Sequence, residues 1–337
     1  MALRFIDGFG GGDSTVLKWD VTSAGYFINN GGSPRVAGGY YGLVSSSVLY
    51  KTIPAANLAI IGTGMNAGSG TVTYTSFYGD SGATQHITVL RNASTGLIEV
   101  RRGSTAGTLL ATGSTTTGTN AWFYIEVSVT ISATVGEVHV RLNGQSTDEV
   151  AFTGNTKNGG TNTTVDKVSI GNSGINGGYF ADFYVLDNTG SANNTFLGDV
   201  TVRTLSPSGN GTYSQLTNSA GNSTNNYSYV NEHGYSGANY TGSVTTGLRD
   251  TYAIADLPSG VSSIYGLQVT GYMAKSDASA ASAKLVLRSG GSLYYDTPRA
   301  LTTSYQSYYA LYESDPATSI PWSISGVNGL ETGMEVA

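Results

Sequence analysis

Apolar and polar residues alternate along residues 124–142. The apolar positions are Ile125, Val127, Val129, Ile131, Val138, Val140 and Leu142. The polar positions between them include Glu126, His139 and Arg141. A period of two predicts β-strands with one face on a core and the other in water. Asn143 and Gly144 tolerate positive φ and predict a tight turn after the second strand. We therefore expect two antiparallel neighbours whose apolar set is buried.

Shorter alternations of the same kind recur along the chain, at 87–89, 97–101, 168–170, 183–186, 199–205, 252–254, 264–273, 284–288 and 305–312. Clusters of Gly, Asn and Ser separate them, and the helix candidates are short turns near Pro54 and Ala280. Short strands with turn residues between them are typical of a sandwich or jelly roll. The chain is predicted to be all-β.

A break in the pattern falls at Leu205–Gly209, where Ser, Pro and Gly follow one another. We place a domain boundary there, which gives domains 1–206 and 207–337. Residues 210–240 are rich in Asn, Ser and Tyr with little periodicity. They are expected to form long ordered loops or an exposed edge.

Composition narrows the classes of partner. Charged residues make up 11% of the 337, the net charge is −6, and only 16 residues are Lys or Arg. No basic stripe exists, so nucleic acid is not an expected partner. The chain has no Cys, which excludes disulfides and thiolate chemistry. The N-terminal residues Met1–Phe5 lead into a predicted strand, and we expect neither a signal peptide nor a membrane insertion.

Several stretches resemble known families. "NAWFYIEVSVTISATVGEVHVRLNG" (120–144) is similar to the central strands of concanavalin-A-like, laminin-G-type jelly rolls. "RFIDGF" (4–9), "ADFYVLDNTGSANNTFLGDVTVRTLSPSGNGTYS" (181–214), "YVNEHG" (229–234) and "LRDTYAIADLP" (248–258) resemble structural proteins of tailed bacteriophages.

The resemblance implies a concanavalin-A-like jelly roll in 1–206, a second β-sandwich-like domain in 207–337 and a place in a phage virion. The expected partners are other virion proteins, further copies of the chain with a trimer favoured, and a host-surface glycan. The protein would be made in the host cytoplasm and released by lysis.

Some concanavalin-A-like relatives are glycosidases with Glu-x-Asp-x-x-Glu on one strand, so the resemblance makes a pair of catalytic carboxylates the first candidate site. The nearest match is Glu313 and Asp315, but Thr318 stands where the second Glu belongs. The pair is interpreted as a solvated strand end before a turn at Pro316.

Other catalytic patterns are incomplete. His86, His139 and His233 lack zincin spacing, and His139 is expected on the surface. Gly234–Gly237 (Gly-Tyr-Ser-Gly) is only a partial match to a nucleophile elbow around Ser236. Gly8, Gly10 and Gly12 lack the Lys-Ser/Thr of a phosphate loop and are read as a hairpin. We expect no catalytic residue and no cofactor.

The sequence signals for metal binding and for glycan attachment are also weak. Asp80, Asp166 and Asp182 offer oxygens for calcium but without EF-hand spacing, so no metal site is assigned. The Asn-x-Ser/Thr motifs at Asn92, Asn162 and Asn222 are attributed to chance in a chain this rich in those residues.

Tyrosine is in excess, at 23 residues. Tyr227, Tyr229, Tyr235 and Tyr240 crowd one stretch. Tyr is common on protein- and sugar-recognition surfaces, although it also suits the outer faces of sheets. The binding residues are left open. The expected function is a non-enzymatic virion protein, a tail fibre or receptor-contacting tail component; the alternatives are a capsid decoration protein and a glycan-degrading depolymerase.

Overall fold

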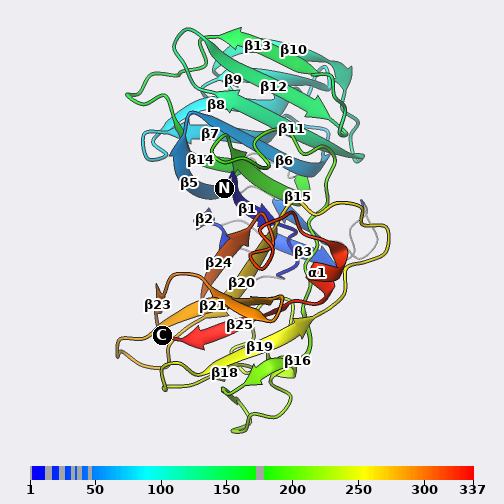
Figure 1. Cartoon of the computed structure of the whole chain (residues 1–337). Helices are drawn as coiled ribbons and strands as arrows, with labels where there is room; N and C mark the ends of the chain where they lie inside the picture. Colours follow the sequence, from blue (N-terminus) through cyan, green and yellow to red (C-terminus); the bar gives the residue numbers. More distant parts are fainter. Residues whose placement is uncertain are drawn as a thin grey trace. The chain divides into compact units, whose positions relative to one another are not determined.

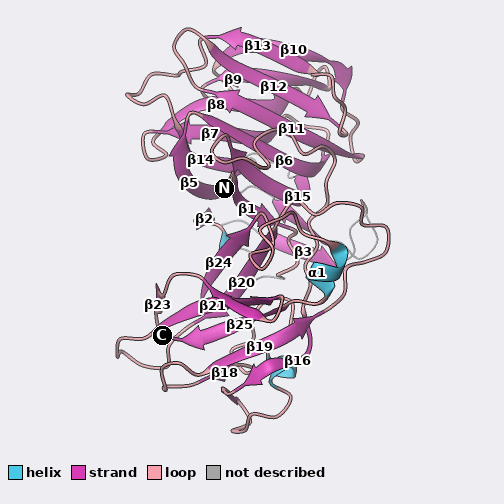
Figure 2. Ribbon diagram, viewed as in Figure 1, coloured by secondary structure: helices cyan, strands magenta, loops and turns pink. Residues whose placement is uncertain are grey.

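The computed structural model describes residues 2–11, 17–22, 27–31, 35, 40–44, 48–171 and 178–337. The chain divides into two compact units, Met1–Arg203 and Thr204–Ala337, against an expected boundary near residue 206. Both units are built from antiparallel strands, as Figures 1 and 2 show. The prediction of an all-β chain is confirmed.

Unit 1 is a jelly-roll sandwich of two sheets. Sheet A follows the order β13 (Val150–Gly154), β12 (Gly136–Leu142), β11 (Trp122–Thr130), β6 (Leu58–Ala67), β15 (Gly178–Asp187), β4 (Tyr40–Val44), β3 (Phe27–Gly31), with β1 (Leu3–Asp7) also on β15. Sheet B follows the order β10 (Thr108–Thr116), β9 (Leu97–Arg102), β8 (Thr84–Arg91), β7 (Val72–Gly79), β14 (Val165–Ile170), β5 (Leu49–Ala56), β2 (Val21–Thr22).

The core of unit 1 lies between these sheets. Tyr74 of sheet B meets Phe123 of sheet A edge-on, with ring centroids 5.6 Å apart. Trp19 packs against Phe5 and Phe183 at 5.2 and 4.9 Å. Such fully buried rings contribute much of the apolar area that holds two sheets together.

The predicted strand pair is confirmed. β11 and β12 are antiparallel neighbours with Val127 opposite Val140. The apolar set is buried as expected: Ile125, Val127, Val129, Val138, Val140 and Leu142. Asn143 and Gly144 both have positive φ, 51° and 68°, as the predicted turn requires.

The expectation of a wet outer face on β11 is wrong. Glu126 points away from the core as predicted, yet it is only 1% exposed. The segment 196–202 covers this face, and its backbone amides reach the Glu126 carboxylate. Residues 199–205, expected as a strand, form no strand, and residues 199–202 belong to this covering segment. Alternation in sequence reports a polar face but not what lies over it.

The helix candidates are also wrong. Pro54 lies within β5, at an irregularity in the β5–β14 pairing where no ladder hydrogen bond is needed. Ala280 lies in a loop. Besides the 3₁₀ residues at 17–18, the described helices are the 3₁₀ turn η2 (Asn226–Tyr229) and the short α1 (Ile324–Asn328), which Ser323 caps by accepting the Gly326 amide.

Unit 2 has one larger sheet and two small ones. Sheet C follows the order β16 (Pro207–Ser214), β19 (Arg249–Ile254), β25 (Glu331–Val336), β21 (Ser282–Ser289), β22 (Ser292–Tyr295), with β23 (Arg299–Ala300) also on β21. The small sheets pair β17 (Thr217–Asn218) with β18 (Thr241–Gly242) and β20 (Leu267–Met273) with β24 (Gln306–Tyr312).

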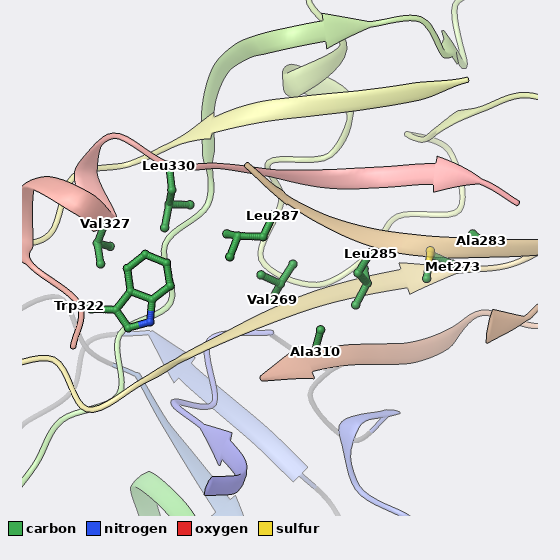
Figure 3. Close-up of a cluster of buried hydrophobic side chains, with 9 residues drawn as sticks. All are labelled: Val269, Met273, Ala283, Leu285, Leu287, Ala310, Trp322, Val327 and Leu330. Carbon is green, nitrogen blue, oxygen red and sulfur yellow. The ribbon is translucent and has the colours of Figure 1, made fainter. Parts of the chain in front are cut away.

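The core of unit 2 lies between sheet C and the β20–β24 pair. Figure 3 shows its members, which are Val269, Met273, Ala283, Leu285, Leu287, Ala310, Trp322, Val327 and Leu330. The indole of Trp322 lies beside Val327 and Leu330, and its N–H donates to the Tyr312 carbonyl at 3.0 Å. A buried indole therefore has its polar atom satisfied.

Residues 210–240 are ordered by polar contacts, as expected of ordered loops. The buried Asp250 carboxylate accepts the amides of Gln215 and Leu216 and the side-chain amide of Asn226. Asn218 donates to Asn226 at 3.0 Å. Hydrogen bonds from Asn side chains hold this stretch in place, where a periodic set of buried apolar residues is missing. Across the described ranges, no helix has both the length and the apolarity needed to span a bilayer.

Candidate binding site

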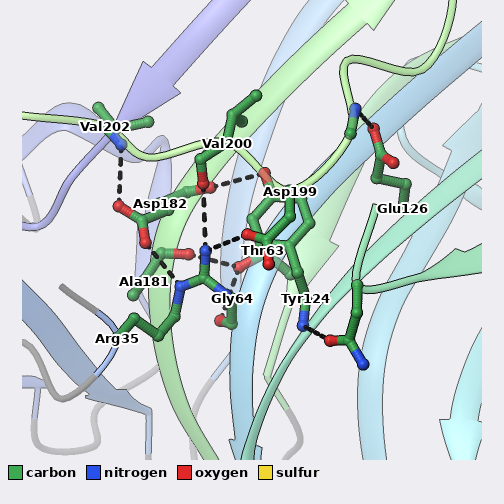
Figure 4. A network of polar contacts seen from close by, with 12 residues as sticks. Arg35, Thr63, Gly64, Tyr124, Glu126, Ala181, Asp182, Asp199, Val200 and Val202 are labelled. Atoms are coloured by element: carbon green, nitrogen blue, oxygen red, sulfur yellow. Dashed lines mark hydrogen bonds and ion pairs between the residues drawn. The ribbon is translucent and has the colours of Figure 1, made fainter. Parts of the chain in front are cut away.

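A buried polar network lies on the outer face of sheet A (Figure 4). Arg35 donates to Asp182 at 2.8 Å and to Asp199 at 2.5 Å. Asp182 also accepts the Val202 amide at 2.8 Å. Beside it, Glu126 accepts the Tyr184 hydroxyl and the amides of Leu197 and Gly198. This network contains two carboxylates, Glu126 and Asp182, whose pKa is raised by burial.

Burial raises the pKa of Glu126 and that of Asp182, in the second case against the opposing effect of the Arg35 guanidinium. Perturbed carboxylates are candidates for acid–base chemistry. Here, however, Glu126 and Asp182 accept hydrogen bonds from backbone amides of the segment 196–202. The network is best described as a clasp that fastens this segment to the sheet.

Two glycines of β6 make room for the clasp. A Cβ on Gly62 would lie 2.2 Å from the Tyr184 ring and 2.7 Å from the Tyr124 hydroxyl. A Cβ on Gly64 would lie 2.5 Å from the Arg35 side chain. Both glycines therefore act as sites of close approach. The Arg35 guanidinium stacks 4.7 Å above the Tyr124 ring.

The other carboxylates named from the sequence also accept hydrogen bonds from backbone amides. Asp80 accepts the amides of Thr161 and Asn162, and Asp166 accepts those of Ser81 and Gly82. Asp80, Asp166 and Asp182 do not converge, and within the described ranges no group of three or more His, Cys, Asp or Glu side chains could hold a metal ion.

Asp315 anchors a turn by accepting the Ser289 hydroxyl and the Ala317 amide, at 2.7 and 3.0 Å. Its neighbour Glu313 is half-buried. The pair follows the end of β24 at Tyr312, as the interpretation requires, but the expectation of a solvated pair is wrong for Asp315, which is buried.

The named histidines and glycines occupy separate places. His86 is buried and accepts the Asn158 amide at Nδ1, 3.2 Å away. His139 contacts Asp148 at 2.8 Å on a half-exposed face, and His233 is exposed. Ser236 accepts the Ala238 amide within its turn. The hairpin predicted from Gly8, Gly10 and Gly12 includes Gly12, which lies outside the described residues.

An exposed aromatic site is found in unit 2. Tyr235 stacks on Tyr305 with centroids 4.4 Å apart and planes at 24°, and it lies 6.0 Å from Tyr272. Tyr235 and Tyr240 are 43% and 47% exposed. Burial raises the pKa of Tyr305, with further contributions from Tyr240 and Tyr235 nearby. We call Tyr235, Tyr240, Tyr272 and Tyr305 the tyrosine cluster.

Strand geometry places this cluster outside the core. Val269 and Met273 of β20 are buried in the core of unit 2. Tyr272 precedes Met273 and therefore points to the opposite face. Tyr305 directly precedes β24, whose Ser307 pairs with Tyr272. The cluster thus joins one end of the β20–β24 pair to the loop that carries Tyr235 and Tyr240.

Sequence reasoning found half of this cluster. Tyr235 and Tyr240 were singled out by their crowding, whereas Tyr227 and Tyr229 belong to η2 and make no described ring contact with the cluster. Tyr272 and Tyr305 were missed. A signal existed, since Tyr272 occupies an outward position between two core residues of a predicted strand.

Comparison with known proteins yields distant structural neighbours. No family model matches the chain, and no curated protein sequence matches it. A carbohydrate-binding module, CBM66 of Bacillus subtilis, aligns with TM-score 0.34 and 8% identity over 50% of this chain and 96% of its own. A Bacillus subtilis protein of unknown function with a galectin-like fold gives 0.39 and 11% over 55% and 96%.

A third neighbour is a conserved carbohydrate esterase of Shiga toxin-encoding bacteriophage phi24B, with TM-score 0.37 and 14% identity over 55% of this chain and 100% of its own. At this distance none of the three transfers a function to this chain.

Proposed function

We propose that the protein is a non-enzymatic component of a bacteriophage virion, located in the tail, that contacts a host-surface glycan through the tyrosine cluster. The observation that carries the glycan contact is the exposure of stacked Tyr235 and Tyr305 beside Tyr240. Stacked tyrosines form a rigid amphipathic surface at low entropic cost, with ring faces for the C–H side of a sugar and hydroxyls for its polar edge.

Two further features support the proposal. Unit 1 is a jelly-roll sandwich, and several stretches of the sequence resemble tailed-phage structural proteins. In the best glycosidase-like match, the Asp315 carboxylate accepts hydrogen bonds from Ser289 and Ala317 and so holds its own turn. The proposal therefore assigns binding rather than cleavage.

The glycan contact is tested on an array of bacterial-surface oligosaccharides. Tyr235→Ala and Tyr305→Ala should each weaken binding about tenfold or more, since each removes one ring of the stack. Tyr295→Ala is the matched control, because Tyr295 is 40% exposed on sheet C and outside the cluster. Equal binding by all three variants would remove the cluster from the site.

Position in the particle is tested separately by immunogold labelling of intact virions. Label on the tail supports the tail component, and label on the head would favour the capsid decoration alternative. Release of reducing sugar from a bound glycan would favour the depolymerase alternative.

A further inference from the structure

A second aromatic site lies in unit 1, on the face of sheet B opposite its core. Lys167 of β14 is paired with Tyr78 of β7, and Tyr50 of β5 is paired with the neighbouring Ser169. The Lys167 ammonium lies 4.8 Å from the Tyr50 ring centroid and 5.2 Å from that of Tyr78. The two rings meet edge-on at 5.7 Å.

Lys167 differs from the other lysines in the described part of the chain. Each of the others donates to a carboxylate or a backbone carbonyl, whereas the Lys167 ammonium has only the two rings. Its neighbour Asp166 forms no ion pair with it; both Asp166 oxygens instead accept the Ser81 and Gly82 amides at 2.7 and 2.8 Å. The Lys167 ammonium can therefore donate a hydrogen bond to a ligand.

The site is held in place before any ligand arrives. Gly82 has φ of +75°, and a Cβ there would lie 2.4 Å from Cε of Lys167, so the turn packs directly against the lysine stem. The rings fix the ammonium from the other sides by cation–π contact. Burial raises the pKa of Tyr50 to about 12, with smaller contributions from Tyr78, with which its hydroxyl forms a hydrogen bond. A pre-positioned cation costs less to order on binding.

We propose that Lys167, Tyr50 and Tyr78 bind the carboxylate of an acidic sugar such as a hexuronate. An unpaired ammonium matches the carboxylate, and the neighbouring rings and hydroxyls match a flat, hydroxylated carrier. An acidic peptide would offer the charge without the ring. This site lies in unit 1 and does not depend on the tyrosine cluster of unit 2.

The test measures binding of the full chain to a glucuronate-terminated oligosaccharide and to its neutral glucose counterpart, by calorimetry or ligand-observed NMR. Wild type should prefer the acidic sugar by about tenfold or more, which is about 1.4 kcal/mol, and the preference should shrink with added salt. Lys167→Gln should abolish the preference while keeping the thermal midpoint of the wild type.

Lys284→Gln is the matched control, because Lys284 also lies over a tyrosine, Tyr295 at 5.4 Å, but is paired with Glu335 at 3.1 Å. It should leave the preference intact. Tyr235→Ala should do so as well, which separates this site from the proposed glycan contact. Retained preference in Lys167→Gln, equal binding of the neutral sugar, tighter binding of a Glu-rich peptide, or no binding by wild type at millimolar ligand would each overturn the proposal.

Discussion

Tyr184 donates its hydroxyl to Oε1 of Glu126, a residue 58 positions earlier in the chain. The same oxygen accepts the amides of Leu197 and Gly198 at 2.8 and 2.9 Å. One carboxylate oxygen thus joins two strands of sheet A to the segment that covers them. The fold of unit 1 therefore depends on a polar contact at a position where the sequence pattern predicts water.

Glu126→Gln and Glu126→Ala separate charge from hydrogen bonding. The glutamine oxygen can accept all three hydrogen bonds, so we expect a small change in the free energy of unfolding at neutral pH. Alanine leaves the donors of Tyr184, Leu197 and Gly198 without their partner and should destabilise the chain by about 3 kcal/mol. Denaturant titration measures both. Equal stability of the alanine variant and the wild type would contradict the clasp.

The Glu126 charge also predicts a pH dependence. Because burial raises its pKa, the folded chain keeps a proton that the unfolded chain releases above its ordinary value of 4.5. This group therefore favours folding most below that pH, and stability falls as the pH rises through the folded pKa. Glutamine does not titrate, so the Glu126→Gln variant does not lose stability in this way as the pH rises. Its stability relative to wild type should grow from acid to neutral pH in parallel denaturant titrations.

His86 predicts the opposite slope. Burial lowers its pKa from 6.5, and Nδ1 must stay unprotonated to accept the Asn158 amide. Its contribution is complete above pH 6.5 and is lost as the pH falls toward the folded pKa. His86→Asn can keep an acceptor for that amide without titrating in this range. Thermal midpoints should then fall less between pH 7 and 5 than in wild type, by about one degree or more. An unchanged slope would contradict this assignment.

Val127 tests the core side of the same strand. It is 1% exposed and lies opposite Val140. Val127→Asp places an unpaired charge between the sheets and should cost about 3–5 kcal/mol. Val135→Asp is the control, since Val135 is 70% exposed in the turn between β11 and β12. Denaturant midpoints should fall steeply for the first variant and barely for the second.

The buried faces of the strands could be predicted from sequence because period-two alternation reports directly on a core. Val127 and Val140 were placed correctly, and the Asn143–Gly144 turn followed from backbone chemistry alone. Glu126 was placed on the correct face but in the wrong environment. Its covering segment lies some 70 residues away in sequence, and one sequence carries no local signal for such a contact.

The candidate sites were harder to predict for the same reason. Tyr235 and Tyr240 were visible as neighbours in a tyrosine-rich stretch, but their contact with Tyr305 depends on folding of the β20–β24 pair. Lys167 carries no motif at all. What distinguishes it from the other lysines is that its ammonium donates to no carboxylate or carbonyl within the described residues, and that can be recognised only once Asp166 is seen bound to Ser81 and Gly82.

Glu149 leads to a prediction about assembly. β10 is an edge strand of sheet B, and edge strands offer unpaired amides to other chains. At an irregularity in β10, Glu149 accepts the Ser114 and Thr115 amides at 2.5 and 2.6 Å and the Thr115 hydroxyl at 2.6 Å. The carboxylate thereby occupies amides that a second strand would otherwise use. Few charged residues protect the other edges of this weakly charged chain.

Glu149→Ala should therefore add a concentration-dependent association through β10 to whatever assembly the wild type forms. For the wild type, the resemblance to phage structural proteins leads us to expect a trimer with contacts from residues 207–337. Light scattering across a concentration series measures the change, and Glu149→Gln, which keeps an acceptor oxygen, should associate less than the alanine variant. Glu137→Ala is the control, because Glu137 lies on the neighbouring sheet with a side chain that is 51% exposed and accepts no amide of β10. If Glu149→Ala and Glu137→Ala scatter alike, the Glu149 carboxylate does not prevent association through β10.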